Sequence, residues 1–282
     1  MNESVAHHRA FKWRTGAMRE EPDRLAVEEP LEIRLGGRRF TLTMRTPGHD
    51  EELAAGFLLA EGFINNRGEL GEIRRLRDSK GAPDPNAIDV ILNVPATGLR
   101  ERLQRNFTVS SSCGVCGKTS IESIERRIAP LTSTVAIGTA ALLRLPTMMR
   151  EAQAVFAATG GLHAAALFEL KHPNEPELLV LREDVGRHNA VDKVMGYAIA
   201  QGITPLSRHV LMASGRLSFE IVQKTAAAGV PILCAVSAPS SLAVDLAEEL
   251  GMTLAGFVRE SNFNIYSHPE RVVIAAANGA EH

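Results

Sequence analysis

The spacing of hydrophobic residues divides the chain into two parts. In the first part it predicts a small unit of strands and one helix. Alternating hydrophobic and polar positions over residues 31–44, interrupted by Gly36-Gly37, predict a β-hairpin. A helix is expected over residues 50–61, with Asp50 as its cap. Two strands are expected after it, over residues 73–77 and 88–94. These elements predict a small α+β domain of ββαββ order over residues 29–106.

From residue 118 onward, helices and strands are expected in turn. Helices are predicted over residues 118–128, 147–158, 189–201, 218–228 and 241–250. Strands are predicted over residues 162–170, 178–185, 209–213, 230–236 and 252–258. Because helices separate the last three strands, we expect those strands to be parallel. The sequence thus predicts an α/β domain over residues 118–282, while the polar residues 1–28, broken by Pro22, predict a flexible arm.

Composition and charge exclude several classes of protein. A chain of 282 residues corresponds to roughly two domains, and 45% hydrophobic with 23% charged residues is ordinary for a globular protein. The net charge of −2 provides no broad cationic field, so nucleic-acid binding is not expected. No apolar run approaches the ~20 residues of a membrane helix, the start does not resemble a secretory signal, and three cysteines do not suggest a disulfide framework. We therefore expect a soluble cytoplasmic protein with neither nucleic-acid nor membrane partners.

Two thiols three positions apart, Cys113 and Cys116, stand out within the expected loop over residues 107–117. Backbone amides at the start of the following helix, together with Lys118, favour the thiolate form of a nearby cysteine. A purely structural role is less favoured, because structural cysteines usually lie within apolar strands. Cys234 is such a residue and is expected in the core.

A Cys-x-x-Cys pair serves three kinds of chemistry. A structural zinc site needs about four ligands, and the sequence has no second pair of this spacing. A dithiol–disulfide exchanger uses the local order of strand, Cys-x-x-Cys and helix. A cysteine that carries sulfur as a persulfide needs a reactive thiolate on a mobile loop. Spacing alone leaves the last two open.

The carboxyl ends of the three expected parallel strands have similar residues. They read Ser214-Gly215-Arg216, then residues 237–241, then residues 259–262. In open α/β sheets ligands bind beyond these ends, and small, hydroxyl-bearing and arginine residues suit a phosphate-containing ligand. Capping serines and ordinary loop arginines would explain any single end, but all three together less well. Neither a Gly-x-Gly-x-x-Gly motif nor a P-loop is present, which disfavours a dinucleotide oxidoreductase or an NTPase.

Residues 182–193 form a third cluster, rich in groups that could bind a polar heterocycle or move a proton. Within it, Asn189 also fits a plain helix cap, with Asp192 three residues later. The functional and the structural interpretations of this cluster carry equal weight.

Five blocks of the sequence together resemble a known family. They are Ser112-Cys113-Gly114-Val115-Cys116-Gly117-Lys118, residues 46–58, residues 182–193, Ser214-Gly215-Arg216 and residues 254–259. In this order they are similar to the formate dehydrogenase accessory sulfurtransferase family, whose members are FdhD-type sulfur carrier proteins. The Cys-x-x-Cys pair alone is a weak signal, but the five blocks together, from about Glu29 to Ser267, are highly specific. The resemblance implies a cytidine-deaminase-like, three-layer α/β fold for the larger domain.

The resemblance also implies a function. Family members take sulfur from a cysteine desulfurase as a cysteine persulfide and pass it to a bis-guanine-dinucleotide pyranopterin cofactor of molybdenum or tungsten, which formate dehydrogenase requires. Carried over by position, Cys113 would be the persulfide carrier and Cys116 an assisting thiol. The residues expected to bind the guanine nucleotide are Phe257, Val258, Arg259, Glu260, Ser261 and Asn262, with Arg216 as a further candidate.

The resemblance further suggests which molecules the protein meets. Mo-bis(molybdopterin guanine dinucleotide) is expected as a bound acceptor substrate, without a permanently bound metal. The expected partners are the desulfurase and the catalytic subunit of formate dehydrogenase, and a homodimer is compatible with the family.

The sequence departs from the deaminase pattern. Deaminases use His-x-Glu followed by Pro-Cys-x-x-Cys, whereas here Ala165 follows His163 at the glutamate position and the Cys-x-x-Cys lies upstream. Deaminase activity is therefore not expected, and zinc held by Cys113, Cys116 and His163 is a minor alternative to an ordinary strand position for His163. A thiol–disulfide oxidoreductase and a non-catalytic cofactor-binding chaperone are the alternatives to sulfur transfer.

Overall fold

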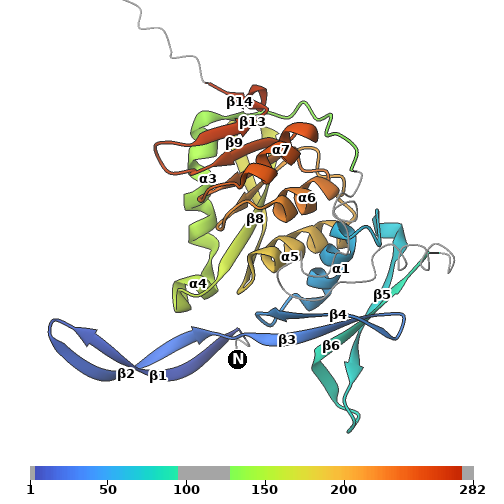
Figure 1. Cartoon of the computed structure of the whole chain (residues 1–282), viewed down its shortest axis with the longest axis vertical. Helices are drawn as coiled ribbons and strands as arrows, with labels where there is room; N and C mark the ends of the chain where they lie inside the picture. The colour runs from blue at the N-terminus through green and yellow to red at the C-terminus, as the bar shows by residue number, and fades with distance from the viewer. Residues whose placement is uncertain (1–3, 95–127, 275–282) are drawn as a thin grey trace, which may run out of the picture.

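The computed structural model describes residues 4–94 and 128–274 of the chain (Figure 1). Its first part contains β1 (Val5–Arg14), β2 (Ala17–Ala26), β3 (Glu29–Leu35), β4 (Arg38–Arg45), α1 (Asp50–Ala60), β5 (Leu70–Arg77) and β6 (Pro83–Leu92). From β3 to β6 the elements follow the ββαββ order that the sequence predicts. They form a four-stranded sheet in the order β4-β3-β6-β5, whose buried strand residues face α1.

The second part contains a larger sheet with helices on both faces. Its helices are α3 (Thr139–Ala152), α4 (Ala154–Thr159), α5 (Arg187–Ala200), α6 (Phe219–Ala227) and α7 (Ser241–Glu249). The strands of this second part are β7 (Ile137–Gly138), β8 (His163–His172), β9 (Glu175–Asp184), β10 (His209–Ala213), β11 (Ile232–Ala235), β12 (Thr253–Gly256), β13 (Asn264–Ser267) and β14 (Val272–Val273). The mixed α/β class predicted from the sequence is confirmed.

The six-stranded sheet has the order β13-β12-β11-β10-β8-β9. Strands β10, β11 and β12 are parallel, as predicted, and β8, β9 and β13 add antiparallel neighbours at the two sides. Alternate residues of β8 enter two different clusters. Ala164, Ala166 and Phe168 pack with α3, whereas Ala165 and Leu167 join the cluster of α5, α6 and α7. The sheet is thus the middle of three layers, and the carboxyl ends of its parallel strands meet at one edge.

Helices α1 and α5 cross at close range and join the two parts. A Cβ atom added to Gly56 would lie 1.8 Å from the carbonyl oxygen of Asp192, and one added to Gly196 would lie 1.7 Å from that of Glu52. Only glycine fits at this crossing. Leu31 and Ile33 of β3 belong to the same buried cluster as Val194 of α5, so one core extends across both parts.

The first residues differ from the flexible arm that the sequence predicts. Strands β1 and β2 pair in continuous antiparallel register and project from the body as a hairpin (Figure 1). Thr15 and Gly16 both have positive φ, 47° and 84°, which suits a two-residue hairpin turn. Lys12 and Asp23 form an ion pair across the strands. The many charged residues conceal this pattern in the sequence because neither face of the hairpin is continuously apolar.

Two further elements differ from the prediction. The helix expected over residues 147–158 begins already at Thr139 and breaks at Gln153, so α3 contains Pro146 in its interior. Its buried face of Leu142, Leu145 and Met149 maintains the helix where proline alone predicts a boundary. Strand β13, for which no strand is expected, pairs with β12 at the edge of the sheet.

Within the described ranges, every helix is too short or too polar to cross a membrane.

Candidate functional site

A cleft of about 1010 Å³ opens at the carboxyl ends of the parallel strands. Its floor contains His163 at the start of β8, Ser214 after β10, Val236 after β11 and Val258 after β12. One wall is formed by α3 and α4, which contribute both apolar and polar side chains. The cleft therefore lies where a ligand of an α/β sheet is expected.

The turn after β12 supplies the polar residues at one end of this cleft. Val258, Arg259, Glu260 and Ser261 line it. The Arg259 guanidinium donates to the carbonyl oxygens of Val236 and Val258, and its backbone N–H donates to the carbonyl of Asn262 at 2.8 Å. Both hydrogen bonds to carbonyl oxygens come from Nη1, so the other nitrogens of the guanidinium are available to an anion.

Phe257 begins this turn in an unusual conformation. Its φ is 51°, in the left-handed region that a bulky residue seldom adopts, and the residue is 41% exposed. The Phe257 amide donates to the carbonyl of Ser237, and the Val258 amide donates to that of Ala235. The turn is thus held against the end of β11 while an aromatic ring faces outward.

The structure brings together part of the set predicted at the strand ends. Ser214 and residues 258–261 line the cleft, whereas Arg216, Phe257 and Asn262 do not. Ser240 caps α7 by accepting a hydrogen bond from the Ala243 amide at 3.3 Å, which is the structural role considered for it. The assignment of residues 257–262 and Arg216 to nucleotide binding stays a prediction.

Helix α3 presents a second arginine to the cleft. Arg150, in the last turn of α3, stacks over the ring of Phe156 with its guanidinium carbon 4.0 Å from the ring centroid. Both residues line the cleft. Among the described residues, no acidic side chain forms an ion pair with Arg150 or Arg259.

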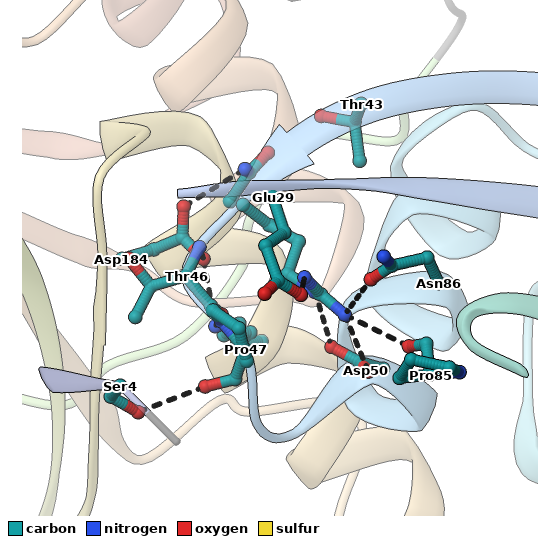
Figure 2. Close-up of polar contacts among 12 residues, drawn as sticks. Ser4, Glu29, Thr43, Thr46, Pro47, Asp50, Pro85, Asn86 and Asp184 are labelled. Atoms are coloured by element: carbon teal, nitrogen blue, oxygen red, sulfur yellow. Dashed lines mark hydrogen bonds and ion pairs between the residues drawn. The ribbon is translucent and has the colours of Figure 1, made fainter. Parts of the chain in front are cut away.

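Residues 44–56 pack against residues 182–184 and 189–196 in what we call the α1–α5 seam, part of which is drawn in Figure 2. The Lys193 ammonium lies 2.7 Å from an Asp184 carboxylate oxygen and donates to the Thr46 carbonyl at 2.9 Å. The Thr46 amide donates to Asp184 at 3.2 Å. Asn189 donates to Asp184 at 2.9 Å and to the carbonyl of Met44 at 2.8 Å. These contacts hold the segment before α1 against α5.

A second buried ion pair lies beside the first (Figure 2). Arg45 donates to Asp50 at 2.9 Å, to the carbonyl of Pro85 at 3.0 Å and to Asn86 at 3.1 Å, and Arg75 adds a bond to Asp50 at 3.0 Å. Asp50 was expected to cap α1. The structure instead has His49 at the cap position, and the Asp50 carboxylate is occupied by the two arginines.

Arg182 and Glu52 link the two sequence blocks across the seam. The guanidinium donates to both carboxylate oxygens, at 2.6 and 2.8 Å. Burial alone would raise the pKa of Glu52, but the hydrogen bonds from Arg182 and His49 and the positive charge of Arg182 outweigh it and lower the pKa to about 2. Glu52 is therefore ionised at neutral pH and serves to join α1 to β9.

Known proteins resemble this chain over nearly its whole length. The model of the FdhD/NarQ family matches residues 26–273. The chain belongs to the FdhD/NarQ family. The "Sulfur carrier protein FdhD" of Mycolicibacterium paratuberculosis is 53% identical, over 89% of this chain and 92% of the relative. Those of Streptomyces avermitilis and Sulfolobus acidocaldarius are 47% and 42% identical, over 98% and 93% of this chain and 99% and 96% of the relatives.

A solved structure also resembles this FdhD/NarQ chain. It is the crystal structure of a putative formate dehydrogenase accessory protein from Desulfotalea psychrophila. Its TM-score is 0.72 at 27% identity, over 95% of this chain and 99% of that one. The family resemblance inferred from the five sequence blocks is confirmed.

In this FdhD/NarQ member, the residues of the cluster 182–193 contact different parts of the structure. Asp184, Asn189 and Lys193 bind the segment before α1, and Glu183 accepts hydrogen bonds from the Val155 and Phe156 amides at 2.9 and 2.7 Å. Asn189 does not cap the helix, since α5 begins at Arg187 with Gly186 at the cap position. For these residues the structural interpretation explains every contact.

His188 lies near Ser218 and Glu220 without forming a catalytic relay. Its Nε2 atom is 3.2 Å from the Ser218 hydroxyl and 2.8 Å from a Glu220 carboxylate oxygen. A Ser-His-acid triad uses the two ring nitrogens for the two partners, whereas here one nitrogen serves both. This arrangement holds the start of α6 beside α5.

His163 is the first residue of β8, where it lines the cleft. Burial lowers its pKa, and the positive charges of Arg187 and His188 lower it further, although Asp184 opposes them. Neither ring nitrogen has a hydrogen-bond partner among the described residues. The sequence predicts only a strand position here, and its place in the cleft depends on the pairing of β8 with β10, which the sequence does not show.

The two cysteines of the family motif, Cys113 and Cys116, lie outside the described residues. Cys234 is buried in β11, and burial raises the pKa of its thiol to about 12. Its predicted place in the core is confirmed. Among the described side chains, no three His, Cys, Asp or Glu residues come close enough together to hold a metal ion.

Proposed function

We propose that the protein is a sulfurtransferase that carries sulfur as a persulfide on Cys113. The donor is a cysteine desulfurase, and the acceptor is the molybdenum or tungsten of a bis-guanine-dinucleotide pyranopterin cofactor. The client is a formate dehydrogenase, and the site of action is the cytoplasm, where thiols remain reduced. The deaminase-like arrangement of the larger domain belongs to the same proposal.

The observation that carries this proposal is membership of the FdhD/NarQ family, whose curated relatives are called sulfur carrier proteins. The sequence retains the motif residues 112–118 that a sulfur carrier needs. The name of the solved relative connects that protein with formate dehydrogenase, and we extend this connection to the present chain.

The proposed chemistry comprises two exchanges. In the first, the Cys113 thiolate attacks the outer sulfur of the desulfurase persulfide, and the desulfurase cysteine leaves as a thiolate. In the second, the S–S bond of Cys113 breaks with its electron pair remaining on Cys113. The outer sulfur then becomes a sulfido ligand with two electrons that the reduced metal supplies. Cys113 ends as a thiolate, ready for another cycle.

The cleft supplies the positioning that the second exchange needs. Arg259 and Arg150 both line the cleft and can bind phosphates, while Phe257, which is exposed next to the lining residue Val258, can offer its side chain to a base. Binding the nucleotide arms fixes the metal while the sulfur approaches. Holding two reactants in this way contributes up to about 7–11 kcal/mol to a reaction.

Intact-protein mass spectrometry tests the carrier role. After incubation with a cysteine desulfurase and free cysteine, we expect the mass of one added sulfur, located at Cys113 by peptide mapping. The Cys113→Ser variant should gain none, while Cys116→Ser, the matched control, should still be loaded. A Cys113–Cys116 disulfide without added sulfur would assign a thiol–disulfide oxidoreductase instead.

Activation of a formate dehydrogenase distinguishes a sulfur carrier from a chaperone that only binds the cofactor. A sulfur carrier without Cys113 cannot activate the enzyme. A cofactor-binding chaperone would remain fully active after loss of both cysteines, and that result would contradict the proposal.

A further inference from the structure

Strands β1 and β2 form a projecting arm, residues 5–26, whose tip exposes a cluster of large apolar side chains (Figure 1). Trp13 and Met18 lie directly opposite each other in the strand register, and Phe11 precedes Trp13 by two positions on the same face. Phe11, Trp13 and Met18 are 72%, 67% and 65% exposed. Single apolar side chains are ordinary on a protein surface, but three neighbours on a projecting ribbon indicate an interaction site. We call these three residues the tip patch.

The charges of the arm leave a local positive surplus. Each of its three acidic side chains pairs with a cation of the facing strand: Glu20 with Arg9 at 2.9 Å, Glu21 with Arg14 at 3.9 Å, and Asp23 with Lys12 at 3.0 Å. Arg19 and Arg24 are exposed and have no acidic partner among the described residues. Because the whole chain has a net charge of −2, this surplus belongs to the arm and not to the chain in general. The arm therefore suits a partner surface that is apolar at its centre and acidic around it.

Two other occupants suit the arm less well. A symmetric contact between the tip patches of two copies would bring together two arms that each have a positive surplus. An anionic lipid surface would meet Glu20, which lies opposite Phe11 on the face of the tip patch. A protein with an acidic rim meets neither difficulty.

The base of the arm adjoins the strand-end cleft through α4. Both strands of the arm contact α4, and a Cβ atom added to Gly161 would lie 3.5 Å from the Cβ atom of Ala26. Phe156 of α4 and Gly161, which follows this helix, line the cleft. Ten residues at about 3.3 Å each place the tip about 30 Å from this base. A protein that binds along the arm is therefore held next to the cleft.

We propose that the arm is the docking site for the client enzyme, which receives the tip patch in an apolar recess with an acidic rim. The choice of the client rests on the proposed function, in which the cofactor bound in the cleft belongs to a formate dehydrogenase. Tryptophan, phenylalanine, methionine and arginine are enriched at protein interfaces. The tip patch supplies the buried centre of this interface, and Arg19 and Arg24 supply charges to its rim.

Trp13 is the only tryptophan of the chain, so its signal alone reports what binds the tip. The full-length protein is labelled with fluorotryptophan, and its fluorine NMR resonance is followed during titration with a formate dehydrogenase that lacks the sulfido ligand. We expect the resonance to shift and broaden with the enzyme, and to stay unchanged with vesicles of anionic lipid or on dilution of the protein alone. A resonance that does not respond to the enzyme overturns the proposal. A response only to lipid, to dilution or to a cysteine desulfurase overturns it too.

Variants measure how much the tip contributes to the affinity for the enzyme. We expect Trp13→Thr, whose β-branched side chain still suits a strand, to weaken binding at least about tenfold in biolayer interferometry. Leu25→Thr, on the opposite face of the arm, is the matched control and should bind like the unaltered protein. Arg19→Glu should weaken binding about threefold at low salt, whereas Arg38→Glu, at the exposed start of β4, should not. Equal affinities of Trp13→Thr and Leu25→Thr would contradict docking through the tip patch.

Sulfur loading of Cys113 is measured on the same samples, which distinguishes failure of this docking site from failure of the proposed function. If Cys113 takes up no sulfur while the Trp13 resonance responds to the enzyme, the carrier role is overturned and the docking site is supported. If Cys113 is loaded normally while the enzyme leaves the Trp13 resonance unchanged, the docking site alone is overturned.

Discussion

The α1–α5 seam and the strand-end cleft contain the same kinds of cationic side chain in opposite situations. In the seam, Arg182 and Lys193 pair with Glu52 and Asp184 at 2.6 to 2.8 Å. In the cleft, Arg150 and Arg259 have no acidic partner within the described ranges. The difference indicates that the seam charges stabilise the fold, whereas the cleft charges are available to a ligand.

This comparison explains why one sequence cluster contains residues of both kinds. Arg182 and Lys193 belong to the seam, and Val185, between them in sequence, lines the cleft. Residues close together in a motif therefore need not share a task. The predictions below test the division by removing charges and close contacts on each side.

The largest effect is expected for Lys193→Met in the seam. Asp184 and Lys193 are both almost completely buried, so the variant leaves a buried carboxylate without its ammonium partner. We expect the free energy of unfolding to fall by about 3–5 kcal/mol, measured by urea denaturation. A loss below about 1 kcal/mol would show that the seam charges contribute little to the fold.

The glycine crossing of α1 and α5 should be the next most sensitive position. Gly196→Ala places a methyl group against a backbone carbonyl, which must force the helices apart and cost at least about 1–3 kcal/mol. Gly161→Ala, whose added Cβ would meet only an ordinary contact at 3.5 Å, is the matched control for thermal unfolding. Equal melting temperatures for the two variants would contradict the close approach.

Some features of the seam and the cleft could be predicted from the sequence, and others could not. The strand His209–Ala213 and the core position of Cys234 follow from local hydrophobic runs. The partners of Asp184 do not, because Thr46 lies 138 positions away in the chain and only the crossing of α1 with α5 brings it close. The same holds for His163, whose place in the cleft depends on its neighbours in the sheet.

Local rules also failed where tertiary contacts outweighed them. Pro146 predicts a helix boundary, yet the buried face of α3 continues past it. Asp50 has the right position for a cap, but Arg45 and Arg75 bind its carboxylate. A cleft does lie at the strand ends singled out in the sequence, because parallel strands share the direction of their carboxyl ends, while ligand binding there stays a prediction.

A smaller, pH-dependent effect is expected for Glu52→Gln. The folded pKa of Glu52 is lowered to about 2, so its ion pair stabilises the fold above the unfolded pKa of about 4.3 and is lost as the pH falls through 2. We expect the variant to be about 1–2 kcal/mol less stable at pH 7, after allowance for solvent screening. The difference should vanish near pH 2 in denaturation curves. A difference independent of pH would argue against the ionised pair.

The smallest effect on stability is expected in the cleft. Arg259→Gln removes an exposed guanidinium that binds only two carbonyls, so its melting temperature should match that of the unaltered protein, with a change in free energy below about 0.5 kcal/mol. Its affinity for GDP should fall about tenfold in titration calorimetry. A destabilised variant with unchanged GDP affinity would show that Arg259 stabilises the fold and does not bind the nucleotide.

The most direct test follows labelled sulfur from Cys113 to the acceptor. The protein is loaded with radioactive sulfur by a cysteine desulfurase, purified, and mixed with formate dehydrogenase whose cofactor lacks the sulfido ligand. We predict that the label moves to the cofactor and that activity appears with it, whereas Arg259→Gln takes up the label normally but delivers it slowly. Activation of the enzyme without movement of the label would contradict sulfur transfer by this protein.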